Sequence, residues 1–144
     1  MNEKGIYCLV FRNPGVSLRV GSLGDVVFSP GWHIYVGSAL GQAGFSRVKR
    51  HIALSAEKNK KPRWHVDYLL NSVSFKLESV YCGRTEDRLE CSISDLLGRE
   101  SVPGFGCSDC KCRSHLFYRD IYPEGEIRSA FDALDLPVHM KKIK

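Results

Sequence analysis

Long hydrophobic runs are missing from this sequence. No apolar stretch approaches the roughly 20 residues that a membrane-spanning helix needs. The first residues, Met-Asn-Glu-Lys, lead into a short apolar segment and not into the apolar core of a secretion signal. Internal repeats and low-complexity segments are absent as well. We therefore expect a folded protein of the cytoplasm that has no membrane partner.

The sequence has six cysteines but no secretion signal, which argues against a disulfide framework. Cys8, Cys82 and Cys91 stand singly on segments with regular periodicity, and the other three lie close together at positions 107, 110 and 112. We expect these cysteines to be reduced thiols or metal ligands.

Length and charge set the next limits. A chain of 144 residues suits one domain over residues 1–144, and a domain of this size buries about 68 to 70% of its unfolded surface. The 21 Lys and Arg residues exceed the 16 Asp and Glu residues, which leaves a net charge of +5. This charge suits a polyanionic partner but is shared by many proteins that bind none. The oligomeric state cannot be read from the sequence.

The segment 32–52 predicts a strand that is followed directly by a helix. Aromatic and β-branched residues alternate with other residues over 32–36, which is typical of a strand. Glycines then break the alternation, and apolar residues recur at helical spacing from residue 45 onward. Arg47 and His51 are four residues apart, so they lie one above the other on this helix.

Further strands are expected on both sides of this segment. Residues 5–11 are apolar on both faces, which is typical of a central strand. Residues 16–28 predict a hairpin, and later strands are expected over 75–82 and 116–118. Tyr7 and Tyr35 would then stand on two strands that can be neighbours in one antiparallel sheet.

Three more helices are expected. Pro62 suits the opening of a helix in which Trp64 packs inward. Thr85 is expected to cap a second helix, with Leu96 in its buried stripe and Gly98 at its end. The third helix ends at Pro137, and the lysine-rich tail beyond it is expected to fray. The elements together predict an α/β (α+β) fold, in which a small central antiparallel sheet is flanked by helices.

Short motifs along the chain resemble the GIY-YIG nuclease superfamily in both order and spacing. Gly-Ile-Tyr stands at 5–7 and Tyr-Val-Gly at 35–37, Arg47 and His51 follow on the next helix, and Glu90 lies on a later one. Two tripeptides alone are weak signals, but five elements in this order, each on the expected structural element, form a specific pattern.

The resemblance covers most of the chain. Its core spans about residues 5–98, and residues 99–144 form a Cys-containing strand-helix extension. Residues 64–70 and 104–118 are similar to the small standalone Uri-type branch, whose physiological role is poorly defined. The hairpin at 16–28 is extra relative to the shortest members of the superfamily.

The resemblance implies an endonuclease that hydrolyses phosphodiester bonds in nucleic acid, with DNA as the expected partner. It implies that Glu90 holds one divalent cation, Mg²⁺ or Mn²⁺, and that Tyr7 is the general base. Arg47 would bind phosphate oxygens, because its planar guanidinium suits them. Tyr35 would orient the phosphate or the attacking water, and His51 would move a proton or bind phosphate.

Polar residues outside these motifs are candidates for substrate contact. The loop 57–63 is basic and precedes a helix that carries charged residues near its start. A further set stands in the later cysteine-containing segment. The substrate-binding candidates are Lys60, Lys61, Arg63, His65, Asp67, Asp109 and His115.

The cysteine cluster allows a different class of function. Cys107, Cys110, Cys112 and His115 are four possible zinc ligands, so the alternative is a non-catalytic, zinc-stabilised nucleic-acid-binding module. If a strand begins by Cys110, however, Cys112 and His115 are an odd number of residues apart and face opposite sides. We therefore expect no stoichiometric zinc.

Overall fold

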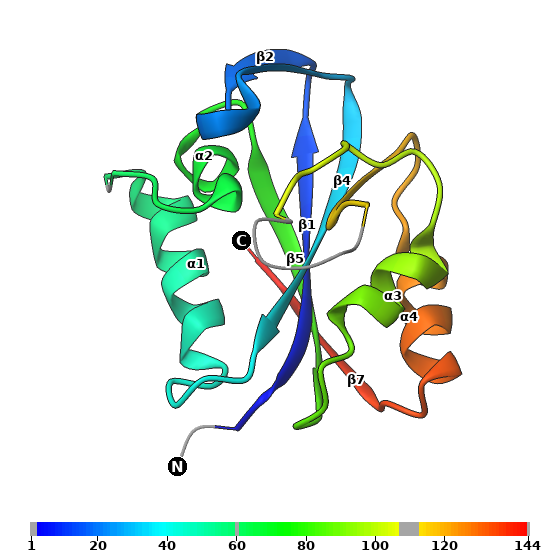
Figure 1. Ribbon diagram of the computed structural model, residues 1–144. Helices are drawn as coiled ribbons and strands as arrows, with labels where there is room; N and C mark the ends of the chain where they lie inside the picture. The colour runs from blue at the N-terminus through cyan, green and yellow to red at the C-terminus, as the bar shows by residue number, and fades with distance from the viewer. Residues whose placement is uncertain (1–2, 60, 107–112, 144) are drawn as a thin grey trace.

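The computed structural model describes residues 3–59, 61–106 and 113–143. Its main sheet is fully antiparallel and has the strand order β6-β4-β1-β5-β7 (Figure 1). The strands are β1 (Gly5–Asn13), β4 (Gly31–Ala39), β5 (Lys76–Arg84), β6 (Leu116–Arg119) and β7 (Val138–Lys142). The central position of β1, where only Arg12 is exposed, confirms the prediction of a strand covered on both faces.

Two pairs of helices cover the two faces of this sheet (Figure 1). Helices α1 (Ser46–Glu57) and α2 (His65–Asn71) lie on one face, and α3 (Glu90–Leu97) and α4 (Glu124–Ala133) lie on the other. Alternate residues of β1 point to opposite faces, so Tyr7 and Leu9 join the core under α1 and α2. Ile6 and Cys8 join the core under α3 and α4. The expected α/β fold is thereby confirmed.

The predicted hairpin is also present. Strands β2 (Val16–Arg19) and β3 (Asp25–Phe28) pair antiparallel as a separate two-stranded sheet, and a short 3-10 helix, η1 (Gly21–Leu23), connects them. Leu23 and Val26 pack against the core on the α1 and α2 side. The hairpin therefore extends the layer that α1 and α2 form, without entering the main sheet.

Several details of the expected helices were wrong. Thr85 does not cap α3, because its hydroxyl oxygen accepts a hydrogen bond from the N–H of Asp87 in a local turn, and the helix starts at Glu90. Leu96 and Trp64 are not packed inward: Leu96 is 50% and Trp64 47% exposed. Gly98 ends α3 as predicted, with a positive φ of 62°.

The tail beyond Pro137 does not fray as expected. Residues 138–142 form β7, which pairs with β5 from Val138 opposite Gly83 to Lys142 opposite Ser79. The backbone hydrogen bonds of an edge strand thus order a segment whose lysines suggested solvent exposure, and these lysines are exposed on that strand. Strands β6 and β7 bring the segment 99–144 into the same sheet as the preceding residues.

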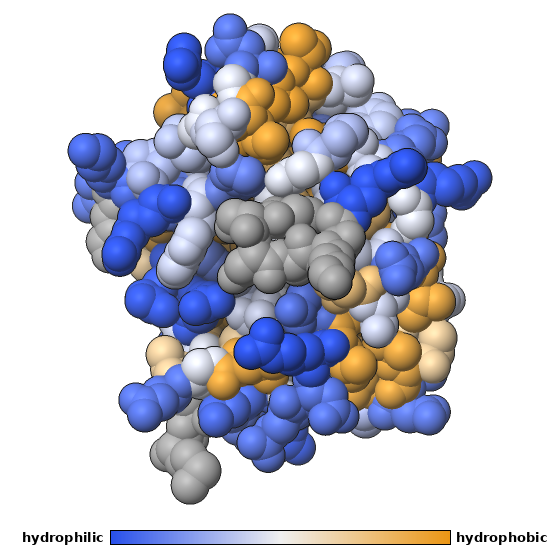
Figure 2. Space-filling view, viewed as in Figure 1, coloured by the Kyte–Doolittle hydropathy of each residue, from blue (hydrophilic) through white to orange (hydrophobic). Residues whose placement is uncertain are grey.

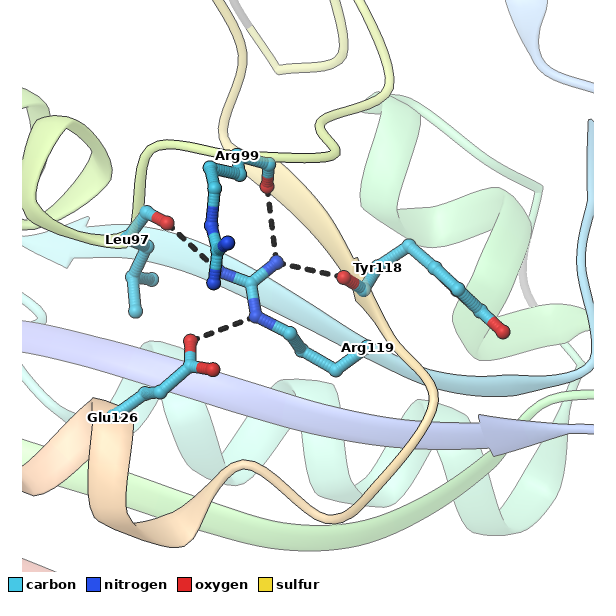
Figure 3. Close-up of polar contacts among 5 residues, drawn as sticks. All are labelled: Leu97, Arg99, Tyr118, Arg119 and Glu126. Carbon is cyan, nitrogen blue, oxygen red and sulfur yellow. Dashed lines mark hydrogen bonds and ion pairs between the residues drawn. The ribbon is translucent and has the colours of Figure 1, made fainter.

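A buried arginine joins α3, β6 and α4 (Figure 3). Arg119 Nε donates to the carboxylate of Glu126 at 2.7 Å, and the other guanidinium nitrogens donate to the carbonyl oxygens of Leu97, Arg99 and Tyr118 at 2.7 to 3.0 Å. The carbonyl of Leu97 belongs to the last turn of α3, where such groups lack a partner within the helix. Arg119 therefore fixes the C-terminal end of the helix that begins at Glu90.

The surface is mostly hydrophilic on the face shown in Figure 2, and apolar residues gather over the hairpin and beside α3 and α4. Val27 and Leu96 are among the exposed large apolar residues of these elements. Within the described part of the chain, none of the helices is both long and apolar enough to cross a membrane.

The first prediction concerns the stability that Arg119 provides. Arg119→Met should lower the free energy of unfolding by about 3 kcal/mol, because buried carbonyl oxygens lose their donors. Arg99→Met, at an exposed side chain, should change it by less than about 0.5 kcal/mol. Urea unfolding followed by circular dichroism measures both, and equal effects of the two substitutions would contradict the role of Arg119.

Candidate active site

The five residues predicted to be catalytic line one cleft of about 540 Å³. They come from four different elements: β1 and β4 of the sheet, α1 on one face and α3 on the other. The five residues are Tyr7, Tyr35, Arg47, His51 and Glu90. Side chains that are up to 83 positions apart in the sequence, from Tyr7 to Glu90, therefore meet in a single polar site.

The pairing of β1 with β4 places the two tyrosines. Tyr7 lies opposite Gly37, and Leu9 lies opposite Tyr35, so the tyrosines are diagonal neighbours with ring centroids 6.4 Å apart. A side chain at position 37 would overlap the ring and hydroxyl of Tyr7. Gly37 is therefore needed for close approach, which explains the glycine of the Tyr-Val-Gly segment.

Tyr7 and His51 form the closest polar contact between the sheet and α1. The hydroxyl oxygen of Tyr7 lies 2.9 Å from Nε2 of His51, and both side chains are buried. His51 is thus a core residue of α1 and not a surface residue of its flank. With the imidazole proton on Nδ1, Nε2 accepts a hydrogen bond from the tyrosine hydroxyl.

Burial shifts the proton affinities of this pair in opposite directions. It lowers the pKa of His51 to about 4, an effect that Asp67 opposes in part. Burial and the neighbouring Tyr35 raise the pKa of Tyr7 well above its usual value, and Arg47 lowers it in part. At neutral pH the site therefore holds a neutral imidazole and a protonated phenol.

Arg47 is held in place from two sides. Its Nη1 donates to the carbonyl oxygen of Ser38 at 3.0 Å, and its guanidinium carbon lies 5.1 Å from the centroid of the Trp64 ring. A cation over the face of a tryptophan ring is attracted by the electron density of the ring. The remaining N–H groups of a guanidinium fixed in this way are suited to phosphate oxygens.

Glu90 is the first residue of α3, where the helix dipole favours a carboxylate. Its Oε2 is buried, and no hydrogen-bond partner for it exists among the residues that the structure describes. A buried carboxylate oxygen usually has a donor or a cation beside it. Glu90 is therefore the residue of the cleft that fits a hard divalent cation, which takes oxygen ligands and keeps bound waters.

The histidines among the substrate-binding candidates line the cleft but also have structural contacts. His65 Nδ1 accepts a hydrogen bond from the N–H of Gly106 at 2.8 Å, so its neutral ring carries the proton on Nε2. His115 Nδ1 lies 2.8 Å from the hydroxyl oxygen of Ser94 on α3, which ties the start of β6 to that helix. Both rings border the cleft while they fix its walls.

Asp67 does not border the cleft, because its carboxylate serves the start of α2. Its Oδ2 accepts hydrogen bonds from the backbone N–H groups of Arg63 at 2.8 Å and Trp64 at 3.0 Å. Arg63 and Trp64 themselves border the cleft. Asp67 thus positions the segment that faces the cleft.

The residues of the basic loop 57–63 differ in whether they reach the cleft. Lys61 is exposed and does not border the cleft, and Lys60 and Asp109 lie outside the described residues. Lys58 ends α1 and donates through Nζ to the carbonyl oxygen of Leu70 at 2.9 Å. Only Arg63 of this loop reaches the cleft among the residues that the structure describes.

The sequence did not predict that Arg88, Ser22 and Trp64 would border the cleft. Arg88 lies two residues before Glu90 and borders the same cleft, as does Ser22 of the hairpin connection. Trp64 was expected to pack inward and instead stands at the border of the cleft. Arg88 had a signal, since it precedes the expected metal ligand, whereas the place of Ser22 depends on how the hairpin folds over the sheet.

The expectation of reduced cysteines holds for some of the cysteines and not for others. Cys8 and Cys82 are free thiols, but Cys91 is disulfide-bonded, so the expectation of reduced thiols was wrong for this residue. Cys107, Cys110 and Cys112 lie outside the described residues, which leaves the zinc alternative untested. No group of three or more His, Cys, Asp and Glu side chains that could hold a metal occurs in the part of the chain that the structure describes.

Comparison with known proteins gives one match. The family model described as "Domain of unknown function DUF123" matches residues 6–136, a span that includes all the described residues bordering the cleft. The chain therefore belongs to this family. Searches of curated proteins and of solved structures found no match.

The second prediction concerns acid stability. Burial lowers the pKa of both His33 and His51 to about 4, whereas the unfolded chain has histidines near 6.5. Between pH 6.5 and 4 the unfolded chain binds more protons, so the free energy of unfolding should fall as pH falls. Each histidine contributes up to about 1.4 kcal/mol per pH unit.

Urea unfolding at several pH values measures this dependence. His51→Gln should reduce the slope between pH 4 and 6.5 relative to the parent protein. If His51→Gln kept the slope of the parent protein, the buried neutral imidazole at position 51 would be ruled out.

Proposed function

We propose that this protein is a divalent-metal-dependent endonuclease of the GIY-YIG type, which hydrolyses phosphodiester bonds in nucleic acid, with DNA as the expected substrate. The observation that carries the proposal is the convergence of Tyr7, Tyr35, Arg47, His51 and Glu90 on one cleft. These are the residues that the resemblance of the motifs assigns to catalysis. Their shared location supports the assignment, because residues this far apart in the sequence have no local reason to meet in one cleft.

The contact between Tyr7 and His51 suits a proton relay. With the imidazole proton on Nδ1, Nε2 of the neutral His51 accepts the hydrogen bond of the Tyr7 hydroxyl, and a lone pair of the phenol oxygen can accept a water molecule. As that water attacks phosphorus, its proton passes to the Tyr7 oxygen while the phenol proton passes to Nε2 of His51. Tyr7 then acts as a base without a long-lived buried phenolate, whose formation the raised pKa disfavours.

Positive charge in the cleft suits a phosphodiester. Three arginines, Arg47, Arg63 and Arg88, border it, and Glu90 is the only carboxylate at its border among the residues that the structure describes. Of the three, Arg47 is held by both a carbonyl oxygen and an aromatic ring. Its guanidinium therefore needs little rearrangement when negative charge develops on the phosphate, so the free-energy cost of reorganisation is small. We assign to it the stabilisation of the transition state.

Glu90 is the residue that would hold the divalent cation. The buried Oε2 fits this role, because the described residues offer it no hydrogen-bond donor. A cation bound there supplies positive charge to the phosphate and lowers the pKa of a bound water. A single carboxylate suits Mg²⁺ or Mn²⁺, which are commonly held by one or two carboxylates with waters and substrate oxygens.

The third prediction tests metal-dependent cleavage. The parent protein should cut at least one member of a panel of single-stranded, branched and duplex DNAs and RNAs when Mg²⁺ or Mn²⁺ is present. Glu90→Gln should lower the single-turnover rate by at least about 100-fold, since it removes a charge needed in the transition state. Glu86→Gln, at an exposed carboxylate, should cut like the parent protein.

Two results would contradict the proposal. Cleavage by Glu90→Gln at the parent rate, with the same metal dependence, would exclude Glu90 as the metal ligand. Binding of nucleic acid with no cleavage of any panel member under either metal would favour the non-catalytic binding module instead.

The fourth prediction separates binding from chemistry. Lys61→Ala should weaken binding and flatten its salt dependence, because each phosphate contact adds about 0.7 to 0.9 to the slope of log affinity against log salt. Arg47→Ala should mainly lower the single-turnover rate at saturating substrate. Arg50→Ala, at an exposed residue of the same helix, is the matched control for Arg47. An unchanged salt slope in Lys61→Ala would mean that the loop only faces solvent.

A further inference from the structure

Trp64 has an unusual position for a large aromatic residue. It is 47% exposed, and it is the only large exposed apolar side chain bordering the cleft among the described residues. The other such side chains belong to different surfaces, such as Val27 on the hairpin and Met140 on β7. Burial of apolar area therefore does not explain why a tryptophan stands here.

The position of Trp64 is fixed by contacts that do not bury its ring. Its backbone N–H donates to Oδ2 of Asp67 at 3.0 Å, and the backbone N–H of the preceding Arg63 donates to the same oxygen at 2.8 Å. The guanidinium of Arg47 lies over the ring, 5.1 Å from its centroid. The buried carboxylate of Asp67 thus anchors the backbone, and the catalytic candidate Arg47 contacts both the Trp64 ring and the carbonyl oxygen of Ser38.

An exposed aromatic ring beside arginines is suited to a nucleotide with an unpaired base. The base can stack on the ring while its phosphate meets the guanidinium groups, and every base has a face that can stack. A paired base inside a duplex offers no free face, since its neighbours cover both sides. An unpaired strand can therefore use such a ring in a way that the stacked interior of a duplex cannot.

The cleft has room for one nucleotide. Tyr7 is only 2% exposed, so a phosphate must enter the cleft to approach its hydroxyl. The residues at its border include Ser22 between β2 and β3, Arg88 before α3 and Gly106 after α3. A volume of about 540 Å³ lies in the range of pockets that hold one small ligand.

We propose that Trp64 is a stacking platform for an unpaired base, and that the substrate is a nucleic acid with a single-stranded segment at the cleaved bond. This inference rests on the proposed nuclease function and specifies its substrate class. DNA and RNA share the required chemistry, an unpaired base joined to a phosphodiester. Trp64 is a substrate-binding residue in this account, and it also positions Arg47.

Tryptophan fluorescence tests the stacking directly, because the chain has two tryptophans. Trp32→Phe leaves Trp64 as the only tryptophan, and Trp64→Phe leaves only Trp32. The ring of Trp32 lies on the other side of the sheet, with its centroid 4.9 Å from that of Tyr122. Both proteins are titrated without divalent metal, so that no cleavage occurs. The ligands are an unstructured DNA strand of about ten nucleotides, the RNA strand of the same sequence and a DNA hairpin duplex.

Single strands should quench the fluorescence of the Trp32→Phe protein and leave that of the Trp64→Phe protein unchanged. In a label-based binding assay, Trp64→Ala should weaken single-strand binding by about 5- to 150-fold, which corresponds to the loss of one stacked base. Trp64→Phe retains a ring and should bind within about 5-fold of the parent protein. Comparison of the DNA and RNA arms shows which sugar the cleft accepts.

Three results would overturn the inference: no quenching of Trp64 by a strand that binds, equal binding by Trp64→Ala and Trp64→Phe, or equal losses of duplex and single-strand binding in Trp64→Ala. Circular dichroism of each variant confirms that it is folded. A protein that cleaves duplexes and shows no quenching would retain the nuclease function and lose this inference. Quenching and the Trp64→Ala loss without cleavage under Mg²⁺ or Mn²⁺ would support the stacking site and contradict the nuclease function.

Discussion

The close approach of β1 and β4 at Gly37 is the constraint on which the cleft depends. Because position 37 has no side chain, the ring of Tyr7 lies over the neighbouring strand, and its hydroxyl lies 2.9 Å from Nε2 of His51. That contact crosses from the sheet to α1 and fixes the helix that also carries Arg47. A larger residue at position 37 would displace Tyr7 and separate the residues that we propose act together.

The cleft contains both neutral buried groups and positively charged side chains. Burial keeps His51 neutral and Tyr7 protonated, whereas Arg47, Arg63 and Arg88 bring positive charge. Glu90 stands across the sheet from α1, at the start of a helix whose other end is held by the buried Arg119. The residues proposed for proton transfer and for metal binding thus come from opposite faces of one sheet, and each set has its own structural support.

The sequence predicted the parts of the fold that follow from local patterns. The buried run of β1, the hairpin and the order of the site residues depend on periodicity and on motifs, and the structure contains them. The start of α3, the strand β7 and the exposure of Trp64 depend on tertiary contacts: a local turn at Thr85, pairing with β5 and the anchoring of α2 by Asp67. The second role of His65, as acceptor for the N–H of Gly106, likewise depends on a loop 41 residues away.

We propose that the cleft binds a divalent cation at Glu90, beside the phosphate whose attacking water Tyr7 and His51 deprotonate. A crystal structure of the protein with Mn²⁺ and an uncleavable phosphorothioate strand tests it most directly, because Mn²⁺ is located by its anomalous scattering. We expect a manganese peak at ligand distance from Glu90, about 2.0 to 2.3 Å, with a phosphate between it and Tyr7. A strand bound in the cleft with no cation at Glu90, or with the cation held by other residues, would contradict it.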